Sequence, residues 1–118
     1  MSQKSIPFCD TALTDTEVLV RTGRCSLTWY HILNTTAAEL YVLFFDAKID
    51  TDVTLGTTVA DFVLGIPAET GAGLGAGACM GLLLPIQFTK GIVVGSLTTA
   101  SGTGHTGAIS CVTLGVGD

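Results

Sequence analysis

The stretch Glu39-Leu-Tyr-Val-Leu-Phe-Phe-Asp46 decides the fold class of this chain. It is rich in aromatic and β-branched residues, and it places apolar side chains on both faces of an extended strand. That pattern is typical of a strand in the middle of a sheet. The run Leu27-Thr-Trp-Tyr-His-Ile-Leu33 precedes it, and Asn34-Thr-Thr-Ala37 between them has the composition of a turn. We therefore predict a long β-hairpin over residues 27–47 as the nucleus of the fold.

Further strands are predicted on both sides of this hairpin. No window shows a sustained helical spacing of apolar residues, whereas short apolar runs recur between clusters of Gly, Asn, Asp and Thr. We predict strands at 17–21, 25–33, 39–49, 60–67, 82–88, 92–98 and 108–114, with a short one near 6–8. Seven to eight short strands predict an all-β fold, an antiparallel β-sandwich of jelly-roll or immunoglobulin-like type. The residues predicted for its core are Leu27, Trp29, Ile32, Leu40, Val42, Phe44, Phe62, Leu64 and Phe88.

The length of 118 residues predicts a single domain over 1–118, with an N-terminal arm at 1–16 and a flexible Gly-Ala loop at 70–81. The first residues lack the apolar core of a signal peptide, which favours synthesis in the cytoplasm. Residues 70–89 are uncharged, but they contain several Gly and a Pro, which make a poor lipid-facing helix. We expect no membrane span.

The charge of the chain excludes one class of partner. The net charge is −5, and only five Lys and Arg residues are scattered along the sequence. Binding to nucleic acid needs clustered Lys and Arg that displace counterions from the phosphates. We therefore expect no nucleic-acid partner.

The distribution of charge points to association with other proteins. From residue 70 to residue 117 the sequence has a single charged residue, Lys90. Strand edges are normally guarded by charges, because an exposed edge recruits other chains. We expect this half to be covered by identical copies or by another protein, unless its Thr, Ser and Gly residues suffice for solubility. The candidate contact residues are Gly71, Gly73, Leu74, Gly75, Gly77, Cys79, Leu82, Leu83, Leu84, Ile92, Val93 and Val94.

Motifs that carry chemistry are weak in this sequence. The glycines of Gly102-Thr-Gly-His-Thr-Gly107 have dinucleotide-site spacing, but too few residues follow them for a βαβ unit. The four cysteines are far apart, and His31 and His105 lie in no nucleophile motif. We expect His31 to be a half-buried, hydrogen-bonded residue of its strand. Asp46, Asp50 and Asp52 lack the spacing of a calcium loop. We predict no catalytic residues, no metal site and no cofactor. An alternative is a carbohydrate-binding module that uses Trp29, Tyr30 and Tyr41.

Four segments in the same order resemble a known family. They are the run of residues 27–47, Val53-Thr-Leu-Gly-Thr-Thr58, Phe62-Val-Leu-Gly-Ile-Pro-Ala68 and Leu82-Leu-Leu-Pro-Ile-Gln-Phe-Thr-Lys-Gly-Ile92. Together they resemble the small β-sandwich virion proteins of tailed bacteriophages, in which a strand leads through Asn-Thr and small residues into a strand that ends in Phe/Tyr-Asp-Ala. The resemblance covers roughly residues 25–100, whereas the four cysteines and the Gly-Ala segment at 71–79 depart from it.

The resemblance implies a structural subunit of the virion, most often a head decoration (cement) protein. Such subunits stabilise the head by binding neighbouring major capsid proteins, and they commonly form homotrimers. The expected partners are therefore further copies of the chain and a major capsid protein, and the expected location is the virion, assembled in the host cytoplasm. The carbohydrate- or receptor-binding alternative would place the chain on a phage tail or fibre.

Overall fold

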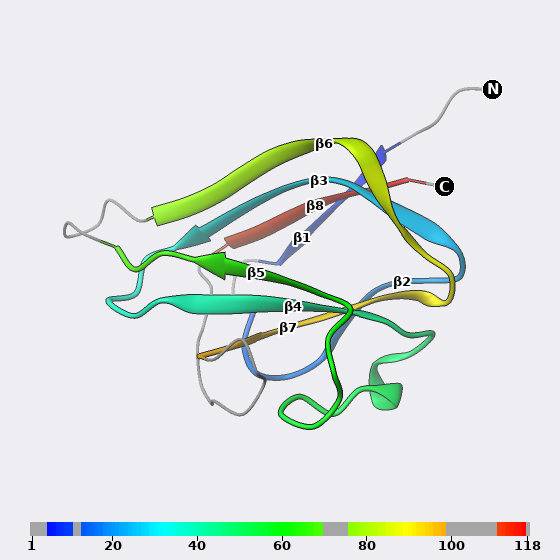
Figure 1. Ribbon diagram of the computed structural model, residues 1–118, viewed down its shortest axis with the longest axis horizontal. Coiled ribbons are helices and arrows are strands. Elements are labelled where there is room, and N and C mark those ends of the chain that lie inside the picture. Colours follow the sequence, from blue (N-terminus) through cyan, green and yellow to red (C-terminus); the bar gives the residue numbers. More distant parts are fainter. Residues whose placement is uncertain (1–4, 11–12, 70–75, 99–110, 118) are drawn as a thin grey trace.

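The computed structural model describes residues 5–10, 13–69, 76–98 and 111–117. Strands make up nearly all of its regular structure, and a short 3-10 helix, η1, lies in the connection between β4 and β5 (Figure 1). In chain order the elements are β1 (Ser5–Asp10), β2 (Val18–Thr22), β3 (Cys25–Asn34), β4 (Leu40–Asp46), η1 (Asp50–Asp52), β5 (Phe62–Ile66), β6 (Ala76–Phe88), β7 (Gly91–Leu97) and β8 (Cys111–Gly117). Within the described part of the chain, no helix has the length and apolar character needed to cross a bilayer.

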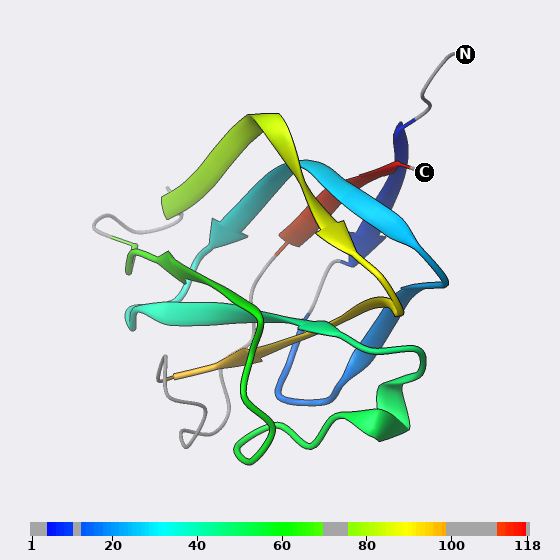
Figure 2. The same ribbon diagram turned by 45° about the vertical axis from the view of Figure 1, so that its right-hand side comes forward.

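The strands form two four-stranded antiparallel sheets, with the orders β1-β8-β3-β6 and β2-β7-β4-β5. The two sheets pack face to face as a sandwich, which is clearest in Figure 2. β1 pairs with β8, β2 with β7, β3 with β6 and β4 with β5. This is the pairing of one long hairpin of eight strands rolled onto itself, the jelly roll. The predicted β-sandwich is therefore confirmed, and the strand order selects the jelly roll.

The core lies between the two sheets. Most of the residues predicted for it are buried there: Leu27, Ile32, Leu40, Val42, Phe44 and Phe88. Phe62 and Leu64 of the edge strand β5 are partly buried and pack against the same cluster, and the Phe62 ring lies 5.4 Å from that of Phe44. The prediction for Trp29 was wrong. The register of β3 shifts between Leu27 and Trp29, and such a bulge exchanges inward and outward positions, so that Tyr30 enters the core instead.

The predicted hairpin over residues 27–47 was also wrong. β3 pairs with β6 and β8, whereas β4 pairs with β5 and β7, so the two strands belong to different sheets. Asn34 fixes the crossing between them. Its buried side chain donates to the carbonyl oxygens of Ala38 (2.9 Å) and Pro67 (3.0 Å) and accepts from the backbone N–H of Thr36 (2.9 Å). The prediction of β4 as a central strand covered on both faces was right.

Two predicted irregular segments contain strands. Within the expected N-terminal arm, the short strand predicted near 6–8 is confirmed as β1 (Ser5–Asp10), which pairs along its length with β8. Residues 76–81, within the expected Gly-Ala loop, begin the edge strand β6; residues 70–75 lie outside the described part of the chain. Both segments are extended because their backbones pair with a neighbouring strand, which local composition does not reveal.

Candidate functional site: the outer face of one sheet

The outer face of the β1-β8-β3-β6 sheet is the candidate functional site. On its four strands the side chains of Phe8, Ile32, Leu114 and their alternate neighbours point into the core, so the intervening positions face outward. At the middle of this outer face lie the side chains of Pro7, Cys9, Trp29, His31, Leu33 and Thr113, with Gly81 and Gly115 beside them. We refer to these eight residues as the neutral face.

The neutral face lacks charge. Asp10 is the only Asp, Glu, Lys or Arg in the four strands that form it. An antiparallel sheet that faces water on one side usually alternates apolar inward positions with polar, often charged, outward ones. The eight residues of the neutral face are small, aromatic or aliphatic, apart from Thr113 and His31. This composition is typical of a sheet that is covered on both faces.

Trp29 lies at the centre of the neutral face. Its register partners are Gly115 of β8 and Gly81 of β6, so a glycine stands on each side of it. The indole lies across Gly115, where a Cβ atom would overlap the ring, whereas a Cβ atom at Gly81 would meet nothing within 4 Å. The ring therefore leans toward β8 and leaves open space above β6.

His31 occupies the next row of the neutral face. Its partners are Thr113 of β8 and Cys79 of β6, and Cys9 of β1 is the partner of Thr113 on the far side. The Thr113 hydroxyl lies 3.8 Å from the Cys9 sulfur. His31 is exposed, whereas the sequence predicted a half-buried histidine on a strand. The shifted register of β3 accounts for this difference as well, because it turns position 31 outward.

The other sheet of the sandwich is covered on its outer face by the chain itself. Residues 47–61, which connect β4 to β5, fold across it and form a second apolar cluster. In that cluster Val53 and Leu55 pack on Phe45 and Val93. The Leu55 side chain fills the space above Gly95 of β7, where a Cβ atom would overlap it. β7 is therefore buried on both faces within one molecule.

The burial of β7 on both faces corrects part of the predicted contact surface. Ile92, Val93 and Val94 are fully buried in β7, so their side chains are not available to a partner. The uncharged sequence of β7 results from intramolecular burial. Among the other candidates, Leu82 is partly buried against the core, while Gly77 is exposed and Leu84 is 83% exposed. Gly71, Gly73, Leu74 and Gly75, and the side chains of Cys79 and Leu83, lie outside the described part of the structure.

The three aromatic residues considered for carbohydrate binding do not share a surface. Tyr30 is buried in the core between the sheets. Trp29 lies on the outer face of one sheet, and Tyr41 packs on the outer face of the other, where its hydroxyl bonds to Glu39. The Glu39 carboxylate, by hydrogen bond and by charge, raises the pKa of Tyr41. A stacking platform made of all three rings is therefore not formed.

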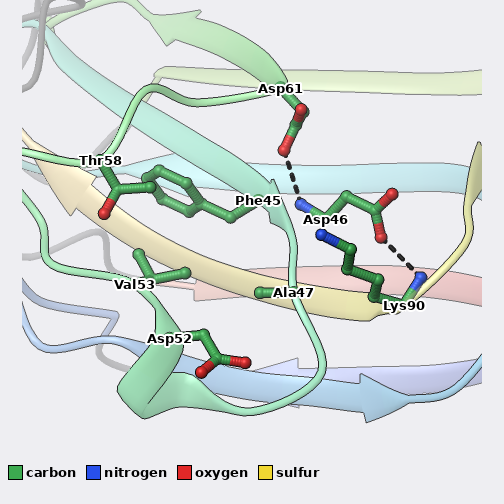
Figure 3. Close-up of a pocket in the computed structure, with 8 residues that line it drawn as sticks. All are labelled: Phe45, Asp46, Ala47, Asp52, Val53, Thr58, Asp61 and Lys90. Carbon is green, nitrogen blue, oxygen red and sulfur yellow. Dashed lines mark hydrogen bonds between the residues drawn. The ribbon is translucent and has the colours of Figure 1, made fainter.

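The acidic residues around the end of β4 line a hollow of about 390 Å³ (Figure 3). Asp46 is central to it and holds the turn between β6 and β7. Its carboxylate accepts from the backbone N–H groups of Lys90 (2.7 Å) and Thr89 (3.2 Å) and from the Thr89 hydroxyl (2.9 Å). The Asp46 backbone N–H donates to the Asp61 carboxylate at 2.7 Å, while Asp52 lies apart on the other side of the hollow (Figure 3).

These contacts define what the hollow can do chemically. Desolvation raises the pKa of Asp46, but the hydrogen bonds from Lys90, Thr89 and Gly91 outweigh it, so the pKa lies below its ordinary value. The carboxylate oxygens of Asp46 are occupied by protein donors. Among the described residues, no three His, Cys, Asp or Glu side chains come together as ligands for a metal ion. The Asp46 carboxylate in this hollow stabilises the turn between β6 and β7, and we assign the hollow no ligand.

One of the two free cysteines that the structure describes lies in the core and the other on the surface. Cys25 is buried at the start of β3, and burial raises the pKa of its thiol, with a smaller opposing effect from Arg21. Cys9 is exposed on the neutral face, and both are free thiols. His105 and the glycines at 102–107 lie outside the described residues.

The neutral face could not be located from the sequence, because it depends on the register of four strands that are distant in the chain. One sequence signal does mark it. Trp29, His31 and Leu33 alternate with the core residues Tyr30, Ile32 and Asn34, and none of the three outward positions is charged. Comparison with protein-family models, with curated proteins and with solved structures finds no match for this chain.

Proposed function

We propose that this protein is a structural subunit that assembles through the neutral face. The observation that carries the proposal is the contrast between the two sheets. One has its outer face covered by residues 47–61 of the same chain, and the other has an uncharged outer face over which no described segment packs. Both sheets have the composition of covered sheets, so the second finds its cover in another protein molecule.

The setting that we propose is the virion of a tailed phage, with the chain as a head decoration protein that binds major capsid proteins. The order of the four segments within residues 25–92 supports this setting, and the β-sandwich agrees with it. The mechanism is burial of apolar surface without covalent chemistry. Repetition over a lattice multiplies a modest affinity for each contact, so a weak interface suffices to hold many copies in place.

The size of the neutral face fits this mechanism. Four strands at about 4.8 Å spacing and about nine residues in length give a face of roughly 20 by 30 Å. A stable interface buries about 800 Å² of each partner, so this face lies at the small end of specific contacts. Trp29 is the residue expected to contribute most, because tryptophan is enriched among residues that dominate interface energies.

A charge placed on the neutral face tests the proposal. His31→Lys adds an ammonium group to an exposed position in the row next to Trp29, and Thr57→Lys adds the same group to an exposed position in the 47–61 segment. Purified protein is mixed with capsids of the encoding phage that lack it, and capsid-bound protein is measured after sedimentation. We expect wild type and Thr57→Lys to sediment with capsids and His31→Lys to remain in solution. Wild-type protein that never binds capsids, or equal binding of both variants, would contradict the proposal.

A further inference from the structure

The two sheets have four edge strands, and three of them carry features that block pairing with another chain. β1 contains Pro7, which lacks an N–H donor, and ends at Asp10. β2 has an irregular register between Leu19 and Arg21, and β5 has only five residues. Proline, charge, irregular register and short length are the usual ways in which proteins protect sheet edges. β6 is the longest strand of the molecule and has no charged residue.

β6 itself is protected over only half of its length. Leu27 pairs with Ile86 and Trp29 with Gly81, so residues 82–85 bulge out opposite a single residue of β3. This bulge contains Pro85 and the exposed Leu84. Residues 76–81 are different. They pair with β3 without interruption, and they contain no proline, charge or bulge. In both views β6 forms the outer margin of its sheet (Figures 1 and 2).

We propose that residues 76–81 of β6 pair antiparallel with the same residues of a second copy of the chain. The two copies are related by a two-fold axis, and their β1-β8-β3-β6 sheets join into one continuous sheet of eight strands. This inference rests on the proposed role as an assembling subunit and on the expectation, from the family resemblance, that the chain binds further copies of itself. It specifies the contact and sets the number of copies in the unit at two, where the family resemblance implies three.

Charge supports a second copy as the occupant of this edge. Each molecule has a net charge of −5, so two copies repel one another unless they meet where neither carries charge. The β6 edge meets this condition, and the neutral face continues from it across Gly81 and Trp29. A strongly charged partner would find no opposite charge on this edge. An identical edge offers equal length and the complementary N–H and C=O groups that an antiparallel pair requires.

The contact is small, which sets its expected strength. Six paired residues extend over about 20 Å, and the area that they bury lies below the roughly 800 Å² per partner of a standard interface. We therefore expect a dimer with a dissociation constant in the micromolar range, which corresponds to about −8 kcal/mol.

Gly81 provides a matched pair of variants at the end of this edge. A Cβ atom there meets nothing within 4 Å, so both Gly81→Lys and Gly81→Ala are compatible with the fold. Analytical ultracentrifugation from about 1 to 100 µM should show wild type and Gly81→Ala approaching twice the monomer mass of 12.1 kDa. We expect Gly81→Lys to weaken the dimer several-fold at about 100 mM salt, because antiparallel pairing would place each added ammonium group against the uncharged 76–77 end of the other copy's strand and take water from it. Hydrogen exchange should show amides at 76–81 protected as concentration rises.

The outcomes separate this inference from the proposed function. A wild-type trimer, or a dimer that Gly81→Lys leaves intact, overturns the edge pairing while self-association stands. A wild-type monomer at every concentration overturns the pairing and self-association together. Capsid binding that His31→Lys abolishes would then still support the decoration role. Concentration-dependent protection of residues 76–81 that is lost in Gly81→Lys supports the pairing.

Discussion

At the residue scale, the contact between Trp29 and Gly115 shapes the centre of the neutral face. The absence of a side chain at Gly115 lets the indole lie flat across β8, while Gly81 on the other side has open space. Both glycines are register partners of Trp29, but only at Gly115 does the indole occupy the space that a side chain would take. Substitution at the two positions should therefore have different effects.

Gly115→Ala should destabilise the protein by about 1–3 kcal/mol, the usual range for an added methyl group in a filled space. Gly81→Ala should change the free energy of unfolding by less than about 0.5 kcal/mol. Urea denaturation measures both. Trp29 is the single tryptophan, so its fluorescence should shift to longer wavelength in Gly115→Ala, as the ring moves off β8. Equal stability of the two variants would show that the indole does not occupy the space above Gly115.

Asp46 is the second residue with a defined role, because its carboxylate holds the turn between β6 and β7. Its pKa is lowered in the folded protein. A lowered carboxyl pKa adds stability that is fully present above the unfolded value of about 3.9, and it is lost as the pH falls through the folded value. Thermal unfolding between about pH 5 and pH 2 should therefore show a loss of stability in wild type.

Asp46→Asn should reduce that acid dependence and lower stability near neutral pH by about 1 kcal/mol, since the partly exposed carboxylate is replaced by a weaker acceptor. Asp50→Asn is the control, because Asp50 is exposed on η1. Its stability at neutral pH should match that of wild type. An acid dependence that Asp46→Asn leaves unchanged would assign the effect to another carboxyl group.

At the scale of elements, the 47–61 segment determines which sheet remains uncovered. It contributes Val53, Leu55 and Ala60 to a cluster on the outer face of the β2-β7-β4-β5 sheet, and the backbone N–H of Leu55 donates to Glu17 at 3.0 Å. The connection between β4 and β5 is therefore a cover for β7, as well as a link between strands. The uncharged β7 needs no partner molecule for this reason.

Leu55→Ala should cost about 2 kcal/mol of unfolding free energy, at the low end for a leucine because Leu55 is only half buried. Val59→Ala is the matched control in the same segment, since Val59 is 86% exposed and should contribute almost nothing. Hydrogen exchange should show faster opening of β7 amides in Leu55→Ala alone. If the two variants were equally stable, the 47–61 segment would not be a packed cover.

At the scale of the whole molecule, charge and apolar surface are separated. Charged residues gather at the ends of strands and in the connections, whereas the four strands of the β1-β8-β3-β6 sheet contain only Asp10. A molecule with a net charge of −5 repels its copies at long range, and the neutral face with the β6 edge is where two copies can approach closely.

Self-association should therefore strengthen with ionic strength. When salt rises from about 10 mM to about 100 mM, the Debye length falls from about 30 Å to about 10 Å, which screens the repulsion between copies. The contact itself contains no ion pair that salt would weaken. We expect the dimer dissociation constant from sedimentation to fall by a few-fold over this range. A dissociation constant that rises with salt would indicate ion pairs in the contact, and with them a different surface.

The sequence by itself determined the fold class and most of the strands. The apolar runs of β3, β4 and β7 are local patterns, and each indicates a strand whatever its partner. The sequence also indicated correctly that β4 is covered on both faces. These conclusions follow from the local pattern of apolar residues, which can be identified without knowing the partner of each strand. The expected cover of uncharged segments by other molecules was wrong for β7, which the chain itself buries, and it stays a prediction for the neutral face.

Only the tertiary structure decided which uncharged strands the chain itself covers. The assignment of β3 and β4 to different sheets, the bulge that turns Trp29 and His31 outward, and the packing of Leu55 over Gly95 all depend on partners far away in the sequence. A shift of register by one residue exchanges the inner and outer faces of a strand, and composition does not record it. Ile92–Val94 and Trp29 therefore exchanged the roles predicted for them, with the three β7 residues inside and the tryptophan on the outer face of the other sheet.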